Sequence, residues 1–215
     1  MKSFLLFGVL LAQVAILPAQ ESRVRIGLEA VALRTMPFAK DLPEGISPLL
    51  VVAPGYRVEY ALTPILSLKG GLAYERKGFS GNLVYTDIYG VPVDSVELRT
   101  RWDCLVLPLS ISASSSGPVR VHADLGVLPG ILVRATNEIP TTDLRVESVD
   151  TREASAPFSF GLTFSGGVSL PLGDGLALDL SIQDHLGLTG VYRSESSWRM
   201  RFHSLGMGAS LLLSL

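Results

Sequence analysis

The stretch from Phe158 to Leu188, FSFGLTFSGGVSLPLGDGLALDLSIQDHLGL, decides the fold because its first half alternates between two kinds of residue. One alternating set is almost wholly apolar: Phe158, Phe160, Leu162, Phe164, Gly166, Val168, Leu170 and Leu172. The other set is small or polar: Ser159, Gly161, Thr163, Ser165, Gly167 and Ser169. A period of two residues is typical of a β-strand, and Gly173-Asp174-Gly175 predicts a tight turn. The stretch therefore predicts a hairpin with one apolar and one nearly bare face.

The same alternation recurs along the chain and predicts eight strands. They cover residues 23–34, 50–62, 65–76, 100–113, 119–134, 157–172, 176–186 and 197–213. Short connections follow the second, fourth and sixth strands (Thr63-Pro64, Ser114 to Pro118 and Gly173 to Gly175), and longer ones follow the first, third, fifth and seventh. This asymmetry is typical of an outer-membrane barrel with short periplasmic turns and longer extracellular loops.

Strand length supports a membrane protein. Several predicted strands have about 11 to 16 residues, whereas about 9 to 11 tilted residues cross the hydrocarbon and a strand in a soluble protein averages about 5 to 6. Backbone groups exposed to lipid must all be paired, so the sheet must close on itself. We therefore expect an all-β fold, an eight-stranded antiparallel up-and-down transmembrane β-barrel.

Charged residues fall on the strand face opposite the apolar one: Arg25, Glu29, Arg57, Glu59, Lys69, Glu75, Arg120, Asp124, Asp179 and His185. Eight strands leave a lumen wide enough only for side chains, so we expect ion pairs inside and little room for a pore. The alternative is a secreted or periplasmic lipocalin-like barrel that binds a small apolar ligand. It reverses the orientation and places Leu162, Phe164, Leu178 and Leu180 around a cavity.

The N-terminus has the pattern of a secretory signal peptide: Lys2, an apolar run from Phe4 to Leu17, then Pro18-Ala19-Gln20. We expect residues 1–20 to be a signal peptide and residues 21–215 to be the barrel domain, exported to the outer membrane. Net charge is −2 and mean hydropathy is +0.38. The near-neutral charge argues against a nucleic-acid partner.

Four segments carry a family resemblance: GLAYERKG from Gly71 to Gly78, RWDCLVLPLSISAS from Arg101 to Ser114, VRVHADLGVLPGILVRA from Val119 to Ala135, and FSFGLTFSGGVSLPL from Phe158 to Leu172. Together they resemble the outer-membrane β-barrel domain family of Gram-negative bacteria that includes PorT-like proteins. The resemblance implies outer-membrane lipid, the barrel assembly machinery and envelope or secretion-complex proteins as partners. The chain ends Leu-Leu-Leu-Ser-Leu, where many outer-membrane barrels end in an aromatic residue.

Candidate chemistry is sparse, and the sequence predicts no catalytic residue, no cofactor and no metal site. The histidines lack metal-ligand spacing, and the lone Cys104 is a small apolar filler. His122 with Asp124, and His185 with Asp179, share predicted interior faces, which favours polar packing. The nearest approach to a hydrolase dyad is His203 with Ser204 or Ser197. We therefore expect a structural or interaction protein without enzymatic activity.

Aromatic residues near strand ends predict interfacial belts. They are Tyr56, Tyr60, Tyr74, Trp102, Phe158, Phe160, Tyr192, Trp198 and Phe202. Two long polar stretches, from Lys77 to Leu98 and from Asn137 to Glu153, are expected to be extracellular loops rich in acidic residues. Solvated loops are the simplest interpretation, and cation binding or adhesion to a partner is the alternative.

Overall fold

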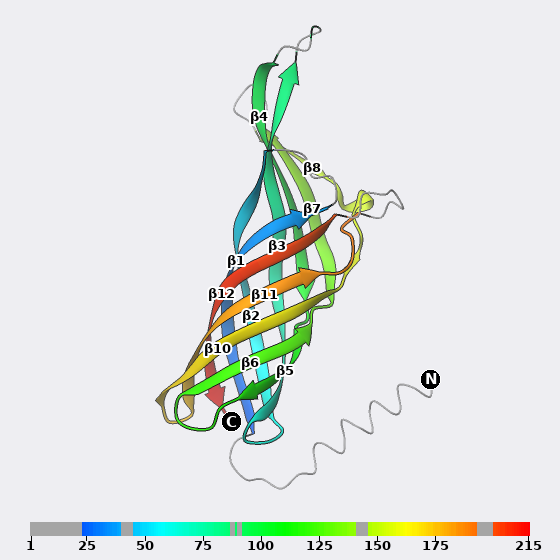
Figure 1. Ribbon diagram of the computed structural model, residues 1–215. Helices are drawn as coiled ribbons and strands as arrows, with labels where there is room; N and C mark the ends of the chain where they lie inside the picture. The colour runs from blue at the N-terminus through cyan, green and yellow to red at the C-terminus, as the bar shows by residue number, and fades with distance from the viewer. Residues whose placement is uncertain (1–22, 40–44, 87–88, 90–91, 141–145, 193–199) are drawn as a thin grey trace, which may run out of the picture.

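A computed structural model describes residues 23–39, 45–86, 89, 92–140, 146–192 and 200–215 (Figure 1). The described residues form twelve strands and one short 3-10 helix, η1 (Arg152–Ala154). The strands are β1 (Val24–Phe38), β2 (Ile46–Ala61), β3 (Leu66–Thr86), β4 (Pro92–Val106), β5 (Leu109–Ser114), β6 (Arg120–Val127), β7 (Gly130–Pro140), β8 (Val146–Asp150), β9 (Phe158–Ser159), β10 (Gly161–Gly173), β11 (Leu176–Gly187) and β12 (Arg201–Ser214). The predicted signal peptide lies outside the described residues and stays a prediction.

The sheet closes into an antiparallel barrel. The pairings run β1–β2–β3–β5–β6–β10–β11–β12 and back to β1. Three of the eight barrel strands are each divided into two elements: β4 with β5, β6 with β7, and β9 with β10. Prolines, which have no N–H to donate to the ladder, lie at two of the divisions, Pro108 and Pro129. The predicted eight-stranded architecture is confirmed.

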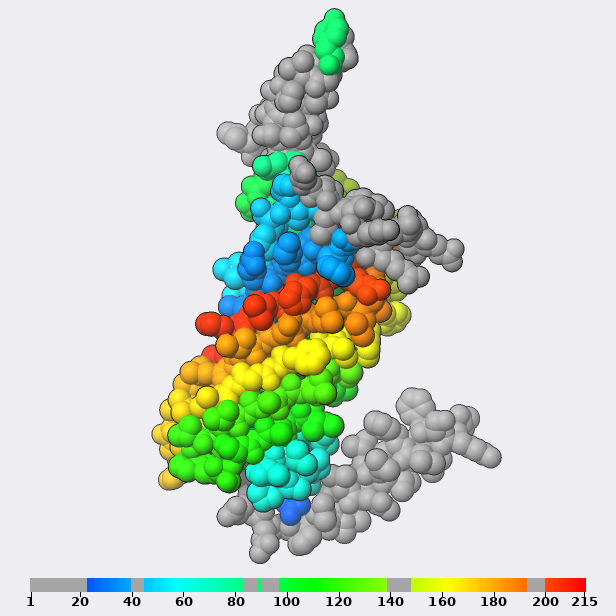
Figure 2. All heavy atoms as spheres, in the orientation of Figure 1, coloured from blue at the N-terminus to red at the C-terminus, as the bar shows by residue number. Residues whose placement is uncertain are grey.

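Most of the large apolar residues of the barrel strands lie on the outside of the barrel. Figure 2 shows the strands as successive diagonal bands, from blue β1 through red β12, orange β11 and yellow β10 to green β6. Exposed on this wall are Leu28, Leu50, Val52, Tyr56, Leu68, Leu107, Leu109, Ile111, Val121, Leu125, Phe164, Leu180, Ile182, Leu205, Met207 and Leu211. The small and polar residues of β10, such as Thr163 and Ser169, therefore face the lumen, as the membrane-barrel interpretation predicts.

The connections differ in length at the two ends of the barrel. The β2–β3, β5–β6 and β10–β11 turns are short and lie at the end where the C-terminus is marked in Figure 1. Gly175 has a φ of 75° in the last of these turns, a left-handed conformation that glycine adopts without steric cost. We call this the turn end and the opposite end the loop end. Among the described residues, no helix has the length and apolar character needed to cross a membrane.

The two polar stretches predicted as loops are largely strands, so that prediction was wrong. β3 continues to Thr86 and pairs with β4 from Pro92 onward, while β7 pairs with β8. Since β4 also pairs with β7, these four strands form a sheet that extends past the barrel at the loop end, which we call the external sheet. A strand with polar residues on both faces lacks the apolar alternation that identifies strands in a sequence.

Pairing between β2 and β3 is interrupted near the loop end. Their ladder runs from Ala61↔Ser67 to Gly55↔Ala73 and resumes at Pro48↔Phe79 with a shifted register. Across this interruption, Thr35 of β1 reaches β3 directly: its hydroxyl donates to the carbonyl of Gly78 (2.9 Å) and accepts from the N–H of Gly78 (3.2 Å). A buried side chain thus satisfies backbone groups of β3 in place of a neighbouring strand.

Candidate functional site

The turn-end half of the lumen is organised around Asp179 of β11. Its two carboxylate oxygens lie 2.9 Å from Nη2 of Arg57 and 2.9 Å from Nε2 of His122. Arg57 and His122 belong to β2 and β6, neither of which pairs with β11. Asp179 therefore connects three separate parts of the barrel wall through its interior.

A second carboxylate, Asp124 of β6, extends this cluster. Lys69 Nζ donates to both of its oxygens at 2.9 Å, and the hydroxyl of Ser165 donates at 2.6 Å. Nδ1 of His122 lies 3.3 Å from Asp124 and 3.3 Å from Lys69. Next to them, a Cβ added to Gly167 would lie only 2.8 Å from Nε2 of His122. The bare face of β10 is thus what makes room for the His122 ring.

The same contacts continue toward the loop end. Arg57 lies 3.5 Å from Glu29, which accepts a 2.9 Å hydrogen bond from the Gln183 amide. The carbonyl of Gln183 lies 3.3 Å from His185, and His185 lies 3.4 Å from Glu75. Glu75 in turn pairs with Lys77 at 3.5 Å. We call this connected set the polar network: Glu29, Arg57, Lys69, Glu75, Lys77, His122, Asp124, Asp179, Gln183 and His185.

Buried charges are tolerated when they are paired, and the expected interior ion pairs are present. Of the two predicted histidine–aspartate pairs, His122 and Asp124 do meet. His185 does not pair with Asp179 but with Glu75. Arg120 lies on the lumen face of β6, as expected, and is exposed at the turn end, where it lines an open hollow with Arg25 and Ser169.

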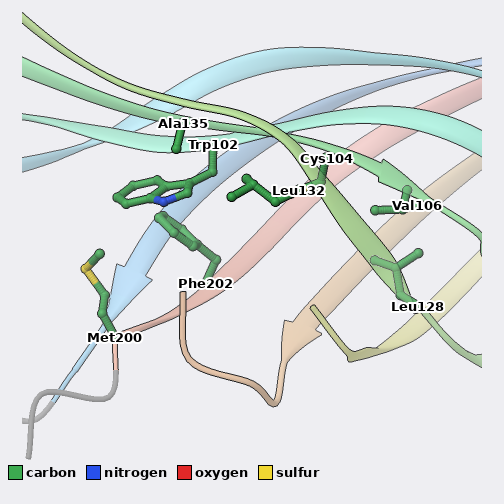
Figure 3. Packing of buried hydrophobic residues seen from close by; sticks show 8 residues of the cluster. All are labelled: Trp102, Cys104, Val106, Leu128, Leu132, Ala135, Met200 and Phe202. Atoms are coloured by element: carbon green, nitrogen blue, oxygen red, sulfur yellow. The ribbon is translucent and has the colours of Figure 1, made fainter. Parts of the chain in front are cut away.

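The loop-end half of the lumen contains an apolar cluster beside Glu75 and Lys77. Eight buried residues, which we call the apolar plug, pack together: Trp102, Cys104, Val106, Leu128, Leu132, Ala135, Met200 and Phe202 (Figure 3). The Trp102 ring lies with its centroid 5.4 Å from that of Phe202 and 6.1 Å from that of Phe79, and its Nε1 donates to the Ser155 hydroxyl at 3.1 Å. Charged side chains therefore predominate in the turn-end part of the lumen, and apolar side chains pack in the loop-end part beside Glu75 and Lys77.

The apolar plug corrects part of the aromatic-belt prediction. Trp102 and Phe202 were expected at the membrane interface but are 2% and 3% exposed inside the barrel. Tyr192 packs edge-on against Trp102, with ring centroids 5.8 Å apart. Phe158, Phe160, Tyr56 and Tyr74 do lie on the outer wall, and Trp198 lies outside the described residues. The sequence did indicate that Trp102 faces the interior. Trp102, Cys104 and Val106 alternate with Leu105 and Leu107, so they lie on the strand face opposite the lipid-facing leucines.

His203 and Ser204, the nearest approach to a hydrolase dyad in the sequence, do not form one. His203 and Ser204 are consecutive strand residues and point to opposite faces, and Ser204 is buried while His203 is exposed. Nε2 of His203 instead lies 2.6 Å from Asp184 on the outer wall. Ser197 lies outside the described residues. Within the described part of the chain, no group of three or more histidine, cysteine or acidic side chains is arranged to hold a metal ion.

The external sheet carries exposed charge. Arg99 Nε donates to Glu97 at 3.0 Å, and this bond lowers the pKa of the Glu97 carboxyl below its ordinary value. Nearer the barrel, Arg101 Nη1 donates to Glu138 of β7 at 2.6 Å. These side chains link β4 to itself and to β7 in water, where such pairs orient strands but stabilise them only weakly.

Comparison with known proteins agrees with the fold. The family model described as outer membrane protein beta-barrel domain matches residues 19–193. The chain belongs to this family. It is an outer-membrane β-barrel protein, in contact with lipid through its outer wall, and its turn end is the periplasmic end.

Two solved structures are similar in fold. Neisserial surface protein A is 12% identical, with a TM-score of 0.51, and the match covers 92% of this chain and 100% of that one. The outer membrane protease OmpT from Escherichia coli is 7% identical, with a TM-score of 0.52, and the match covers 92% and 99% of the two chains. No curated protein matches the sequence. The narrower resemblance to PorT-like proteins stays a prediction.

Proposed function

We propose that this protein is a non-catalytic outer-membrane protein that acts as a structural or interaction partner through its external sheet. The observation that carries the proposal is the continuation of β3, β4 and β7 past the barrel, where β8 joins them. Closing a barrel removes free strand edges. Among the described residues, β8 pairs only with β7 and so leaves one edge of the external sheet open, and exposed edges are common sites of strand addition. Support of an envelope or secretion complex is the role that the family resemblance suggests.

The lumen supports a role at the surface rather than in transport. The polar network and the apolar plug together fill much of the described interior, and eight strands leave a lumen wide enough only for side chains. No observation favours the lipocalin-like alternative, because Phe164 and Leu180, which it requires around a ligand, are exposed on the outer wall.

Photo-crosslinking on intact cells tests the proposal. A photoreactive amino acid replaces Arg99 of the external sheet, and a matched control places it at Leu180 on the lipid-facing wall. We expect discrete protein adducts from position 99 and lipid adducts alone from position 180. Protein adducts from position 99 should also disappear when 82–97 is replaced by a short turn, which keeps the photoreactive residue, while heat-modifiable migration of the barrel persists. An absence of protein adducts at position 99 would refute the interaction role.

A further inference from the structure

The outer wall contains an apolar hollow of about 530 Å³ near the loop end. It is lined by Leu72, Leu105, Leu107, Pro129, Gly130, Ile131, Phe158, Ser159, Phe160 and Thr189. The hollow lies where the barrel strand formed by β6 and β7 is divided at Pro129. Its rim is formed by side chains that stand out from the wall, among them Leu107, Ile131 and Phe158.

The hollow lies at the level of the external leaflet. About 9 to 11 tilted residues cross the hydrocarbon, and counting that far from the turn after Ser114 reaches Leu105 of β4. The same count along β6 and β7 from Arg120 reaches Gly130. The hollow is therefore in the external half of the hydrocarbon layer, just below the headgroups.

The occupant of the hollow follows from its surroundings. It is continuous with the lipid-facing wall, and its volume is within the range of about 300–1,000 Å³ found for small-molecule sites. The β5–β6 and β4–β7 ladders approach Pro129 in one register, from Leu109↔Val127 to Val106↔Gly130, and Leu107 N–H donates to the carbonyl of Pro129 at 2.8 Å. With the backbone paired, the surface offers a partner little besides apolar contact, which suits an alkyl chain.

Polar groups lie at the external margin of the hollow. The hydroxyl of Thr189 accepts a 2.9 Å hydrogen bond from the N–H of Phe160 and is exposed at the rim. Arg134 is exposed three residues beyond Ile131 along β7, a rise of about 10 Å at 3.3–3.4 Å per residue. A guanidinium at headgroup level binds phosphate through paired hydrogen bonds.

We propose that this hollow is a specific lipid site, which holds one acyl chain of an external-leaflet lipid whose anionic phosphate binds Arg134. The site is distinct from the general lipid contact of the wall because it is concave and holds one chain between Leu107, Ile131 and Phe158. The proposal does not depend on the role of the external sheet.

Native mass spectrometry of the full chain, released from detergent with added phosphatidylglycerol, tests the site. We expect one retained lipid per protein. Leu107→Trp fills the hollow and should reduce retention at least fivefold. Leu180→Trp is the matched control, since the exposed fractions of Leu107 and Leu180 are 44% and 45%, and it should retain the lipid. Equal retention by the two variants, or no retention by the unmodified protein, would overturn the proposal.

The headgroup contact has its own readout. The unmodified protein should prefer phosphatidylglycerol over zwitterionic phosphatidylethanolamine several-fold, and Arg134→Gln should remove this preference while keeping the bound chain. An unchanged preference in Arg134→Gln would exclude Arg134 as the phosphate ligand. If Leu107→Trp does not reach the heat-modifiable folded form, Ile131→Trp fills the same hollow from its other side and is judged by the same criterion.

Discussion

Glu75 of β3 and His185 of β11 meet at 3.4 Å although their strands lie on opposite walls of the barrel. Going round the wall from β3 to β11 passes β2, β1 and β12. Contacts of this kind hold the interior together across the lumen, as the hydrogen-bond ladders do around its circumference. The polar network therefore holds the barrel interior together alongside the apolar plug.

The Arg57–Asp179 ion pair provides the first prediction. Arg57→Met leaves the Asp179 carboxylate buried beside His122 alone, so we expect the free energy of unfolding to fall by about 3–5 kcal/mol, the usual effect of removing one partner of a buried pair. The double variant Arg57→Met/Asp179→Leu should be less destabilised than the sum of its single variants. Urea unfolding of the barrel in lipid vesicles measures both.

The exposed Arg99–Glu97 pair supplies the control for that experiment. Both side chains are about half exposed, and Arg99→Ala should change stability by at most about 1 kcal/mol. A loss as large as that of Arg57→Met would contradict the distinction between interior and external pairs.

The bare face of β10 provides a second prediction. The Cβ of Gly167→Ala would lie too close to the carbonyl oxygen of Leu180 and only 2.8 Å from His122 Nε2. Overpacking should therefore lower the free energy of unfolding of this variant by about 1–3 kcal/mol. Gly166→Ala, on the opposite face of the same strand, is the control. Its Cβ would have nothing closer than 3.7 Å. Equal stability of the two variants would show that β10 does not pack against His122.

The alternation in the sequence was sufficient to predict the closed barrel and to place the charged residues inside it, because side-chain direction in a strand depends only on parity. Parity cannot say which interior residues meet. Asp179 was grouped with His185 because they share β11, yet contacts across the lumen give it Arg57 and His122 instead. The apolar plug was missed because Trp102 and Phe202 fit an interfacial belt equally well on the sequence alone.

The apolar plug leads to a third prediction. Trp102→Ala removes the side chain at the centre of the plug and should lower the free energy of unfolding by about 3–5 kcal/mol, as large-to-small changes in packed interiors do. Phe38→Ala on the outer wall, where Phe38 is 63% exposed, should lower it much less.

Planar-bilayer recordings of the unmodified protein should show no conductance far above background. A steady open current would mean that the plug does not close the lumen.

Thr35 provides a fourth prediction through its two hydrogen bonds to Gly78. Thr35→Val keeps the shape of the side chain but leaves the N–H and carbonyl of Gly78 without this partner. We therefore expect the free energy of unfolding to fall by about 1–3 kcal/mol. Thr35→Ser retains the hydroxyl and should remain close to the unmodified protein. If Thr35→Ser is as unstable as Thr35→Val, the methyl group rather than the hydrogen bonding is responsible.

The interrupted ladder between β2 and β3 determines where the barrel wall opens first in local unfolding. Between Pro48 and Gly55 the two strands share no register, whereas β2 keeps its full pairing with β1 through this region. Amide protons exchange with solvent through the local opening of least free energy. Exchange should therefore begin along this side of the loop end and spread from there. The β2–β3 seam is then the weakest joint of the closed sheet near the loop end, and the hydroxyl of Thr35 bridges it through its two hydrogen bonds to Gly78.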